Sequence, residues 1–122
     1  MSGEETLLDI ARRNFYTAQL LWKNMGDDEG YLNIIAYHLQ QAVELALKHA
    51  LELEGIEYPK THDIDDLLNR YPGDEFDALL PWAAAITNME AKTRYVKNYR
   101  VSLKTIKAVF PLVEEMLDTC NQ

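Results

Sequence analysis

Several features are scarce in this chain of 122 residues, and each scarcity excludes a class of protein. A single cysteine, Cys120, excludes an intrachain disulfide and gives no indication of an oxidising compartment. No apolar run reaches the ~18 residues or more that a membrane-spanning helix needs. At the N-terminus acidic residues precede the apolar ones, which is the reverse of a secretory signal peptide. We therefore expect a cytoplasmic protein without a membrane span.

Basic residues are also scarce, because 12 Lys and Arg face 20 Asp and Glu, a net charge of −8. This balance argues against a protein that coats nucleic acid or an anionic membrane through its overall charge. The shortage is uneven, since no acid lies between Glu90 and Glu114. That stretch carries six bases, at Lys92, Arg94, Lys97, Arg100, Lys104 and Lys107. The remaining residues, with 20 acids and 6 bases, therefore carry −14.

Apolar residues recur at steps of three and four, which predicts an all-α fold. The expected helices span residues 4–25, 31–54, 64–71, 75–93 and 102–120. Pro81 should kink or restart the fourth helix, and Pro111 should distort the fifth. Residues 94–101 are expected to form an irregular basic link. We expect one domain over residues 1–122, an up-down antiparallel four-helix bundle with an additional short helix at 64–71.

Metal-binding and nucleophilic sites find little support in the sequence. His38 and His49 lie 11 residues apart on one helix, so they stand ~16 Å apart and cannot share an ion. Ser102 is explained as a helix cap, and Cys120 lies on an apolar stripe. Neither a P-loop nor a GxGxxG element is present. We therefore expect no metal, no cofactor and no nucleophilic catalytic residue.

The best functional candidate is the segment 94–100, where bases alternate with tyrosines. Its candidate residues are Arg94, Tyr95, Lys97, Tyr99 and Arg100. Arginine can contact a phosphate through two parallel hydrogen bonds, and tyrosine can stack on bases. The alternative is a solvated loop whose bases pair with the acidic helices and whose tyrosines cover the edge of the core.

A second group of polar residues interrupts the apolar helix at 31–54. Glu44 and Lys48 are spaced i, i+4 with the acid first, the stabilising order for an ion pair on a helix. Together with Gln40 and Gln41 they form either a surface strip or a polar face toward the basic link or another subunit.

The order of these motifs resembles the HEPN domain family. The motifs are Gln41-Ala42-x-Glu44-x-x-x-Lys48, Thr61-His62-Asp63, the pair Leu67-Leu68, and Thr93-Arg94-Tyr95. The resemblance extends from about residue 5 to residue 120. It implies an up-down helical bundle, frequent dimerisation and a role in nucleotide or RNA biology. Many such domains are encoded beside a minimal nucleotidyltransferase in toxin–antitoxin-like pairs, and others are ribonucleases.

Ribonuclease members of the family carry an Arg, then four to six residues, then a His. The corresponding window after Arg94 offers Tyr99, Arg100 and Val101, and no other arginine is followed by a His at that spacing. The usual catalytic pair is therefore absent, and metal-independent cleavage of RNA needs such a proton-transfer group beside a cation.

Three hypotheses follow. The first is a non-catalytic module that binds a nucleotidyltransferase partner, a nucleotide or an RNA phosphate. Its supporting polar residues are Gln41, Glu44, Lys48, His62 and Asp63. The second is a divergent ribonuclease toxin that uses Arg94 with His62 or Tyr99. The third is a plain self-associating protein whose seam is the stripe at 103–120 or the wide face of helix 31–54, and a homodimer is the expected assembly.

Overall fold

The computed structural model describes residues 4–95 and 97–120, without the side chains of Ala91, Arg94 and Tyr95. Within these ranges the chain is all-helical, as predicted, and has no strand. The α-helices are α1 (Leu7–Asn24), α2 (Leu32–Leu53), α3 (Ile64–Arg70), α4 (Ala83–Tyr95) and α5 (Leu103–Thr119). Two 3₁₀ helices, η1 (Glu29–Tyr31) and η2 (Asp77–Trp82), precede α2 and α4. None of the described helices is both long and apolar enough to cross a bilayer.

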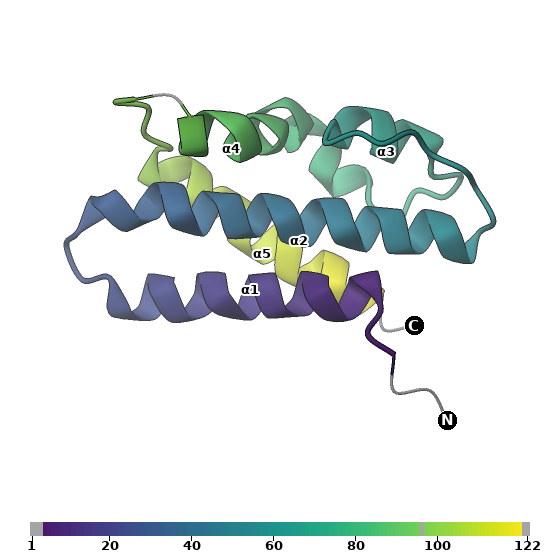
Figure 1. Cartoon of the computed structure of the whole chain (residues 1–122), viewed down its shortest axis with the longest axis horizontal. Helices are drawn as coiled ribbons and strands as arrows, with labels where there is room; N and C mark the ends of the chain where they lie inside the picture. The colour runs from purple at the N-terminus through teal and green to yellow at the C-terminus, as the bar shows by residue number, and fades with distance from the viewer. Residues whose placement is uncertain (1–3, 96, 121–122) are drawn as a thin grey trace.

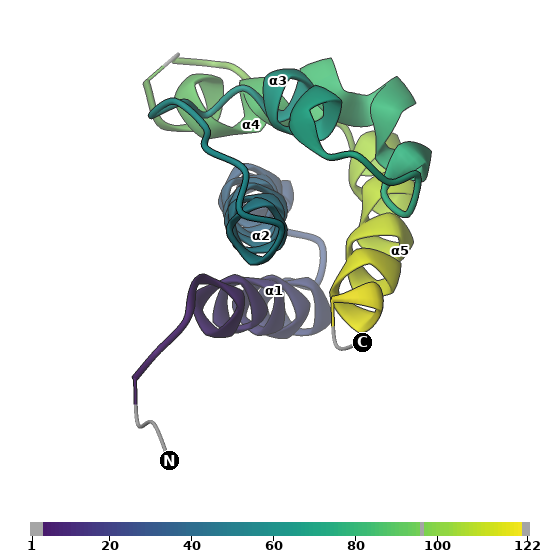
Figure 2. The ribbon, with the colours of Figure 1, turned by 90° about the vertical axis from the view of Figure 1, so that its right-hand side faces the viewer.

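Helix α2 lies at the centre of the bundle (Figures 1 and 2). Helix α1 runs antiparallel along one side of α2, and α3 and α4 cover the opposite side. Helix α5 crosses obliquely behind α2 and also contacts α1, with its last turns toward the start of α1. The structure is therefore the expected helical bundle with a short additional helix.

The central place of α2 follows from its composition. Its fully or almost fully buried apolar residues are Leu32, Ile35, Ala36, Leu39, Ala42, Val43, Ala46, Leu47, Ala50 and Leu51. An apolar surface this wide has to be covered by more than one neighbouring helix. The alanines lack bulk beyond Cβ, so α1 and α4 can approach the α2 backbone closely.

Capping residues set the starts of three helices. Thr6 and Asp9 form a reciprocal capping box at the start of α1. Asp63 accepts hydrogen bonds from the amides of Asp65 and Asp66 at α3, and Ser102 accepts one from Thr105 at α5. The N-cap predicted at Ser102 is thereby confirmed.

Two sequence expectations about the second half of the chain are refined. The helix expected at 75–93 is two elements, because Pro81 belongs to η2 and α4 begins at Ala83. Helix α4 then continues to Tyr95, so the backbone of Arg94 and Tyr95 is helical and not part of an irregular link. No Pro or Gly stands there to end the helix. Pro111 lies within α5 without ending it.

The burial of α2 predicts a steep contrast between two leucines of this helix. Leu39 is fully buried, whereas Leu53 is 72% exposed. Leu39→Ala should lower the free energy of unfolding by roughly 2–5 kcal/mol, because it removes buried methyl groups and leaves a cavity. Leu53→Ala should change it by no more than about 0.5 kcal/mol. Urea denaturation followed by circular dichroism measures both, and equal losses would contradict the central position of α2.

Candidate functional site

The structure separates the predicted site residues into two groups along α2. Gln41, Glu44, Lys48 and His62 meet around the middle of the helix. The link before α5 is instead attached to Asn33, near the start of α2. Asn33 and Glu44 are 11 residues apart, which corresponds to ~16 Å along a helix axis. The two groups are therefore separate sites.

The Glu44 cluster consists of Gln40, Gln41, Glu44, Lys48 and His62. The Glu44 carboxylate accepts hydrogen bonds from Gln40 Nε2 (2.7 Å) and His62 Nδ1 (2.9 Å) on Oε1, and from Lys48 Nζ (2.9 Å) on Oε2. Gln41 Nε2 in turn donates to Gln40 Oε1 at 2.7 Å. The Glu44 side chain is only 5% exposed, so these donors replace the water that the carboxylate has lost. The predicted Glu44–Lys48 pair is present.

The donors also decide the charge of Glu44. Burial by itself would raise the pKa of the Glu44 carboxyl, but the hydrogen bonds from Lys48, His62 and Gln40 outweigh it and lower the pKa. Glu44 is thus ionised at neutral pH. An ionised carboxylate can only accept, so His62 Nδ1 carries the proton of this hydrogen bond.

The Glu44 cluster fastens the segment between α2 and α3 to the central helix. Tyr58 lies below Lys48 Nζ, with 5.7 Å from the nitrogen to the ring centre, and donates its hydroxyl proton to Glu52 at 2.6 Å. Burial and the bond to Glu52 raise the pKa of Tyr58 to about 12, so the phenol stays protonated. Asp63 caps α3, and no hydrogen bond joins it to the cluster in the described part of the chain. The Glu44 cluster thus has a structural role, which is to attach the segment before α3 to α2. His62 is the most exposed residue of the cluster.

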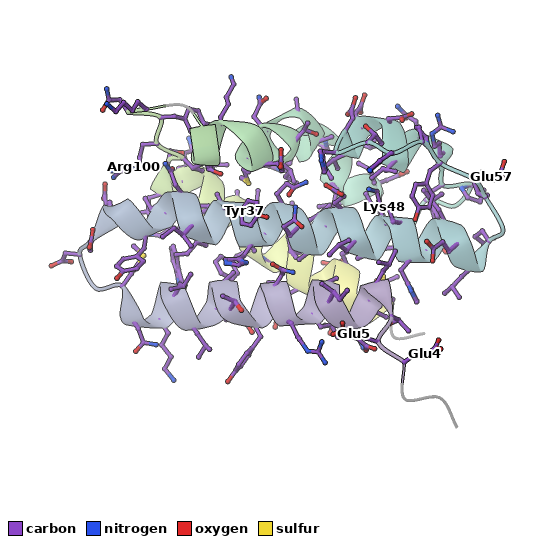
Figure 3. The ribbon with its side chains drawn as sticks, in the orientation of Figure 1. Glu4, Glu5, Tyr37, Lys48, Glu57 and Arg100 are labelled. Atoms are coloured by element: carbon purple, nitrogen blue, oxygen red, sulfur yellow. The ribbon has the colours of Figure 1, made fainter. Side chains whose placement is uncertain are left out.

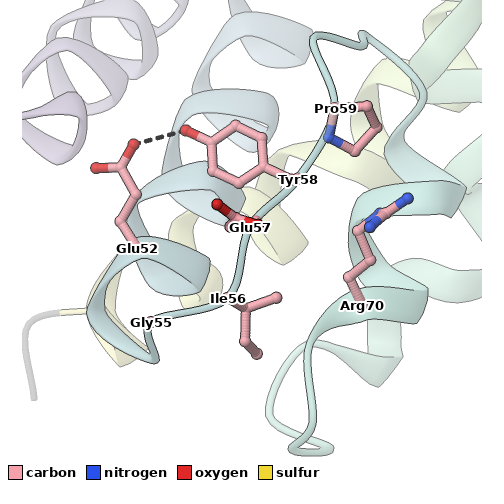
Figure 4. A pocket seen from close by; sticks show the side chains of 7 residues that line it. All are labelled: Glu52, Gly55, Ile56, Glu57, Tyr58, Pro59 and Arg70. Atoms are coloured by element: carbon pink, nitrogen blue, oxygen red, sulfur yellow. Dashed lines mark hydrogen bonds between the residues drawn. The ribbon is translucent and has the colours of Figure 1, made fainter.

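A hollow of about 780 Å³ lies beside this segment (Figure 4). Its polar side chains are Glu52, Glu57, Tyr58 and Arg70. The Arg70 guanidinium is bound to Asp66 at 3.1 Å, and Glu52 is bound to Tyr58. None of the predicted site residues lines this hollow.

The second group is positioned by Asn33, which the sequence did not identify. Its amide group donates to the Tyr99 carbonyl (2.7 Å) and accepts from the Val101 amide (2.9 Å). Lys92 Nζ lies 5.9 Å from the centre of the Tyr99 ring, and Asn98 adopts a left-handed conformation with φ of 64°. No spacing rule connects Asn33 with residues 66 and 68 positions away, so only the folded chain reveals this contact.

The bases on this side form what we call the basic end: Lys92, Lys97, Arg100, Lys104 and Lys107. All five are exposed, and within the described residues none is ion-paired with a carboxylate. The alternative, in which the bases of the link pair with acidic helices, is therefore not seen for the described side chains of Lys97 and Arg100. Figure 3 places Arg100 at the opposite end of the bundle from Glu4, Glu5 and Glu57.

Tyr99 agrees with the alternative interpretation of the tyrosines, in which they cover the edge of the core. It is half-buried and packs against the core, so its ring covers a core edge and is flanked by Lys92. The side chains of Arg94 and Tyr95 lie outside the described residues, and their candidate roles stay predictions. The Ile64 amide donates to Thr87 Oγ1 at 2.9 Å, which anchors the Thr61–His62–Asp63 turn near Thr87. Arg94 follows Thr87 by seven residues, ~10 Å along α4.

The Glu44 cluster predicts a pH-dependent stability. Glu44→Gln should lower the free energy of unfolding at pH 7 by roughly 1.5–3 kcal/mol, the worth of hydrogen bonds to a charged group. Because folding lowers the pKa of Glu44 from its ordinary 4.5, the loss should be full above that pH. It should shrink as the pH falls through the lower, folded-state pKa.

Urea titrations from pH 7 to pH 3 measure this dependence. The control is Glu115→Gln on α5, an exposed helical glutamate whose side chain makes no hydrogen bond or ion pair in the part of the chain that the structure describes. A loss for Glu44→Gln that stayed constant over this range would show that the carboxylate charge is not what stabilises the cluster.

Comparison with known proteins identifies the family. The family model of the HEPN domain matches residues 4–122, almost the whole chain. Neither the curated proteins nor the solved structures give a significant match. The match covers the range of the resemblance, and the structure has the helical bundle that the resemblance implied. The chain belongs to the HEPN domain family.

Proposed function

We propose that the chain is a non-catalytic HEPN module whose basic end binds the phosphate groups of RNA or of a nucleotide. The observation that carries this proposal is the set of exposed bases without carboxylate partners in the described structure, at Lys97, Arg100 and Lys104. Bases that are not neutralised by the protein keep their charge for an external anion. Asn33 holds the backbone on both sides of Arg100, which limits the entropy lost when a phosphate binds.

The acidic residues in the rest of the chain also favour binding at the basic end. The net charge of the chain is −8, so a polyanion is repelled by most of the surface and attracted only at the basic end. The binding would therefore be local and oriented, unlike the nonspecific coating that the overall charge excludes.

The histidines support a non-catalytic role. His38 Nδ1 lies 2.7 Å from Asn14 Oδ1, and burial lowers the pKa of His38, which disfavours its charged form. His62 is held by Glu44 near the middle of α2, away from the basic end. Proton transfer at a phosphate requires an acid or base within hydrogen-bond reach, and both histidines are engaged with other protein groups, Asn14 and Glu44.

Membership of the HEPN family adds two partners to this proposal. HEPN domains often dimerise, so we place the chain in a homodimer. A minimal nucleotidyltransferase, in a toxin–antitoxin-like pair, is the proposed heterologous partner. Co-expression with the neighbouring reading frame tests this pairing, and failure of a nucleotidyltransferase to co-purify would remove it.

Removing bases from the basic end should weaken RNA binding in a salt-dependent way. We expect the triple variant Lys97→Ala/Arg100→Ala/Lys104→Ala to bind a fluorescent single-stranded RNA at least tenfold more weakly at low salt. The slope of log K against log salt should fall by about 2, since each phosphate contact to a single strand contributes ~0.7. Fluorescence anisotropy measures both quantities.

The control is Lys60→Ala, which removes an exposed base that lies outside the basic end. It should leave affinity and slope almost unchanged. Equal effects of the triple variant and the control, or an RNA affinity too weak to measure in the native protein, would remove the proposed site. Competition by AMP distinguishes a nucleotide site from one that needs several phosphates.

The non-catalytic role predicts that RNA stays intact. Incubated with a labelled single-stranded RNA and EDTA, the native protein should leave it as intact as the variants His62→Ala and Arg94→Ala do. Cleavage by the native protein that both substitutions abolish would instead establish the divergent ribonuclease, with His62 and Arg94 as its residues.

A further inference from the structure

Helix α1 carries an exposed stripe with two large apolar side chains. Tyr16 is 61% exposed and Leu20 is 43% exposed, and Lys23 continues their spacing of four and three residues. These side chains therefore share one side of the helix. Tyr16 and Leu20 form a small exposed apolar patch on this side of the helix. Its meaning depends on what lies next to it.

A groove lies beside this stripe, between α1 and α5. It consists of two hollows of about 390 Å³ each that share Trp22 and Lys107. Apolar side chains line both, with Met25 and Leu103 in one and Phe110 and Pro111 in the other. The Phe110 ring lies 5.7 Å from Phe15 and 5.5 Å from Trp22, so aromatic contacts hold this part of the groove. We call it the α1–α5 groove.

The charges around the stripe and the groove are complementary. The stripe ends in Lys23, which has no ion-pair partner among the described residues. The α1–α5 groove carries three acids, Asp27, Glu29 and Glu114, against one base, Lys107, so its rim is acidic on balance. An apolar stripe with a base thus lies next to an apolar groove with an acidic rim. Such a surface is self-complementary, which a two-fold dimer requires.

We propose that a second copy of this chain docks here, with the α1 stripe of each copy in the α1–α5 groove of the other. This inference deepens the homodimer of the proposed function and depends on it. The acidic rim favours this occupant over RNA, because carboxylates repel a phosphate backbone. Of the basic end, Lys107 lines both hollows and would be covered in such a dimer, whereas Lys97, Arg100 and Lys104 line neither hollow and stay accessible.

Helix geometry identifies a pair of charges across the dimer axis. Gln19 and Glu114 line the same hollow, and Phe110, one turn before Glu114, contacts Phe15. If two antiparallel α1 helices cross at Gln19, Lys23 of the partner subunit comes level with Phe15. That position is beside Glu114. Each dimer would then contain the Lys23–Glu114 pair twice.

Reversal of these two charges tests the proposal. The native chain should sediment at about twice its 14.1 kDa at high concentration. Lys23→Glu and Glu114→Lys should each weaken the dimer by roughly tenfold or more, because each places like charges together. The double variant, and an equimolar mixture of the two single variants, should recover the native dissociation constant.

The matched control is Glu115→Lys, an equal charge change next to Glu114 at an exposed residue that does not line the groove. It should leave the dimer intact, and thermal melts followed by circular dichroism verify that every variant folds. Leu20→Ser should also weaken the dimer, because it removes the apolar contact.

The possible results distinguish a failure of this surface from a failure of the homodimer. A monomer at every concentration overturns both the homodimer and this surface. A dimer that tolerates both reversals, or single losses without recovery in the double variant, overturns this surface alone. RNA binding by the double variant reports on the basic end independently, so a failure of phosphate binding is recognised separately.

Discussion

The burial of α2 on nearly every side is the constraint on which the rest of the structure depends. A polar group inside such a helix must find partners within the protein, since water is excluded. Glu44 meets this demand by recruiting Lys48 from its own helix and His62 from the segment before α3. Satisfying one buried carboxylate therefore also sets the path of the chain from α2 to α3.

The same helix positions the basic end through a single amide. Asn33 bonds to the backbone on both sides of Arg100, so the start of α2 holds the link between α4 and α5. The Glu44 cluster and the basic end are consequently two separate attachments to one rigid element. The proposed functions are distributed in the same way, with phosphate binding at one end of the bundle and self-association on the face of α1 and α5.

Helical periodicity predicted the helices well because each follows from local spacing and burial. Ser102 was interpreted as a helix cap, and it is the N-cap of α5. The end of α4 was less predictable, because Arg94 and Tyr95 are compatible with either a helix or a loop. Asn33 could not be predicted at all, since its partners lie 66 and 68 residues away and no pattern connects them.

The sequence by itself determined the all-α class, the Ser102 cap, the Glu44–Lys48 pair and the family, because these depend on neighbours within a few residues or on motif order. Only the tertiary structure decided which polar residues meet. It joined His62 to Glu44, left the described bases between Lys92 and Lys107 without carboxylate partners, and opened the α1–α5 groove. The physical reason is that contacts across the bundle arise from the packing of whole helices, and this packing is not encoded in any short segment.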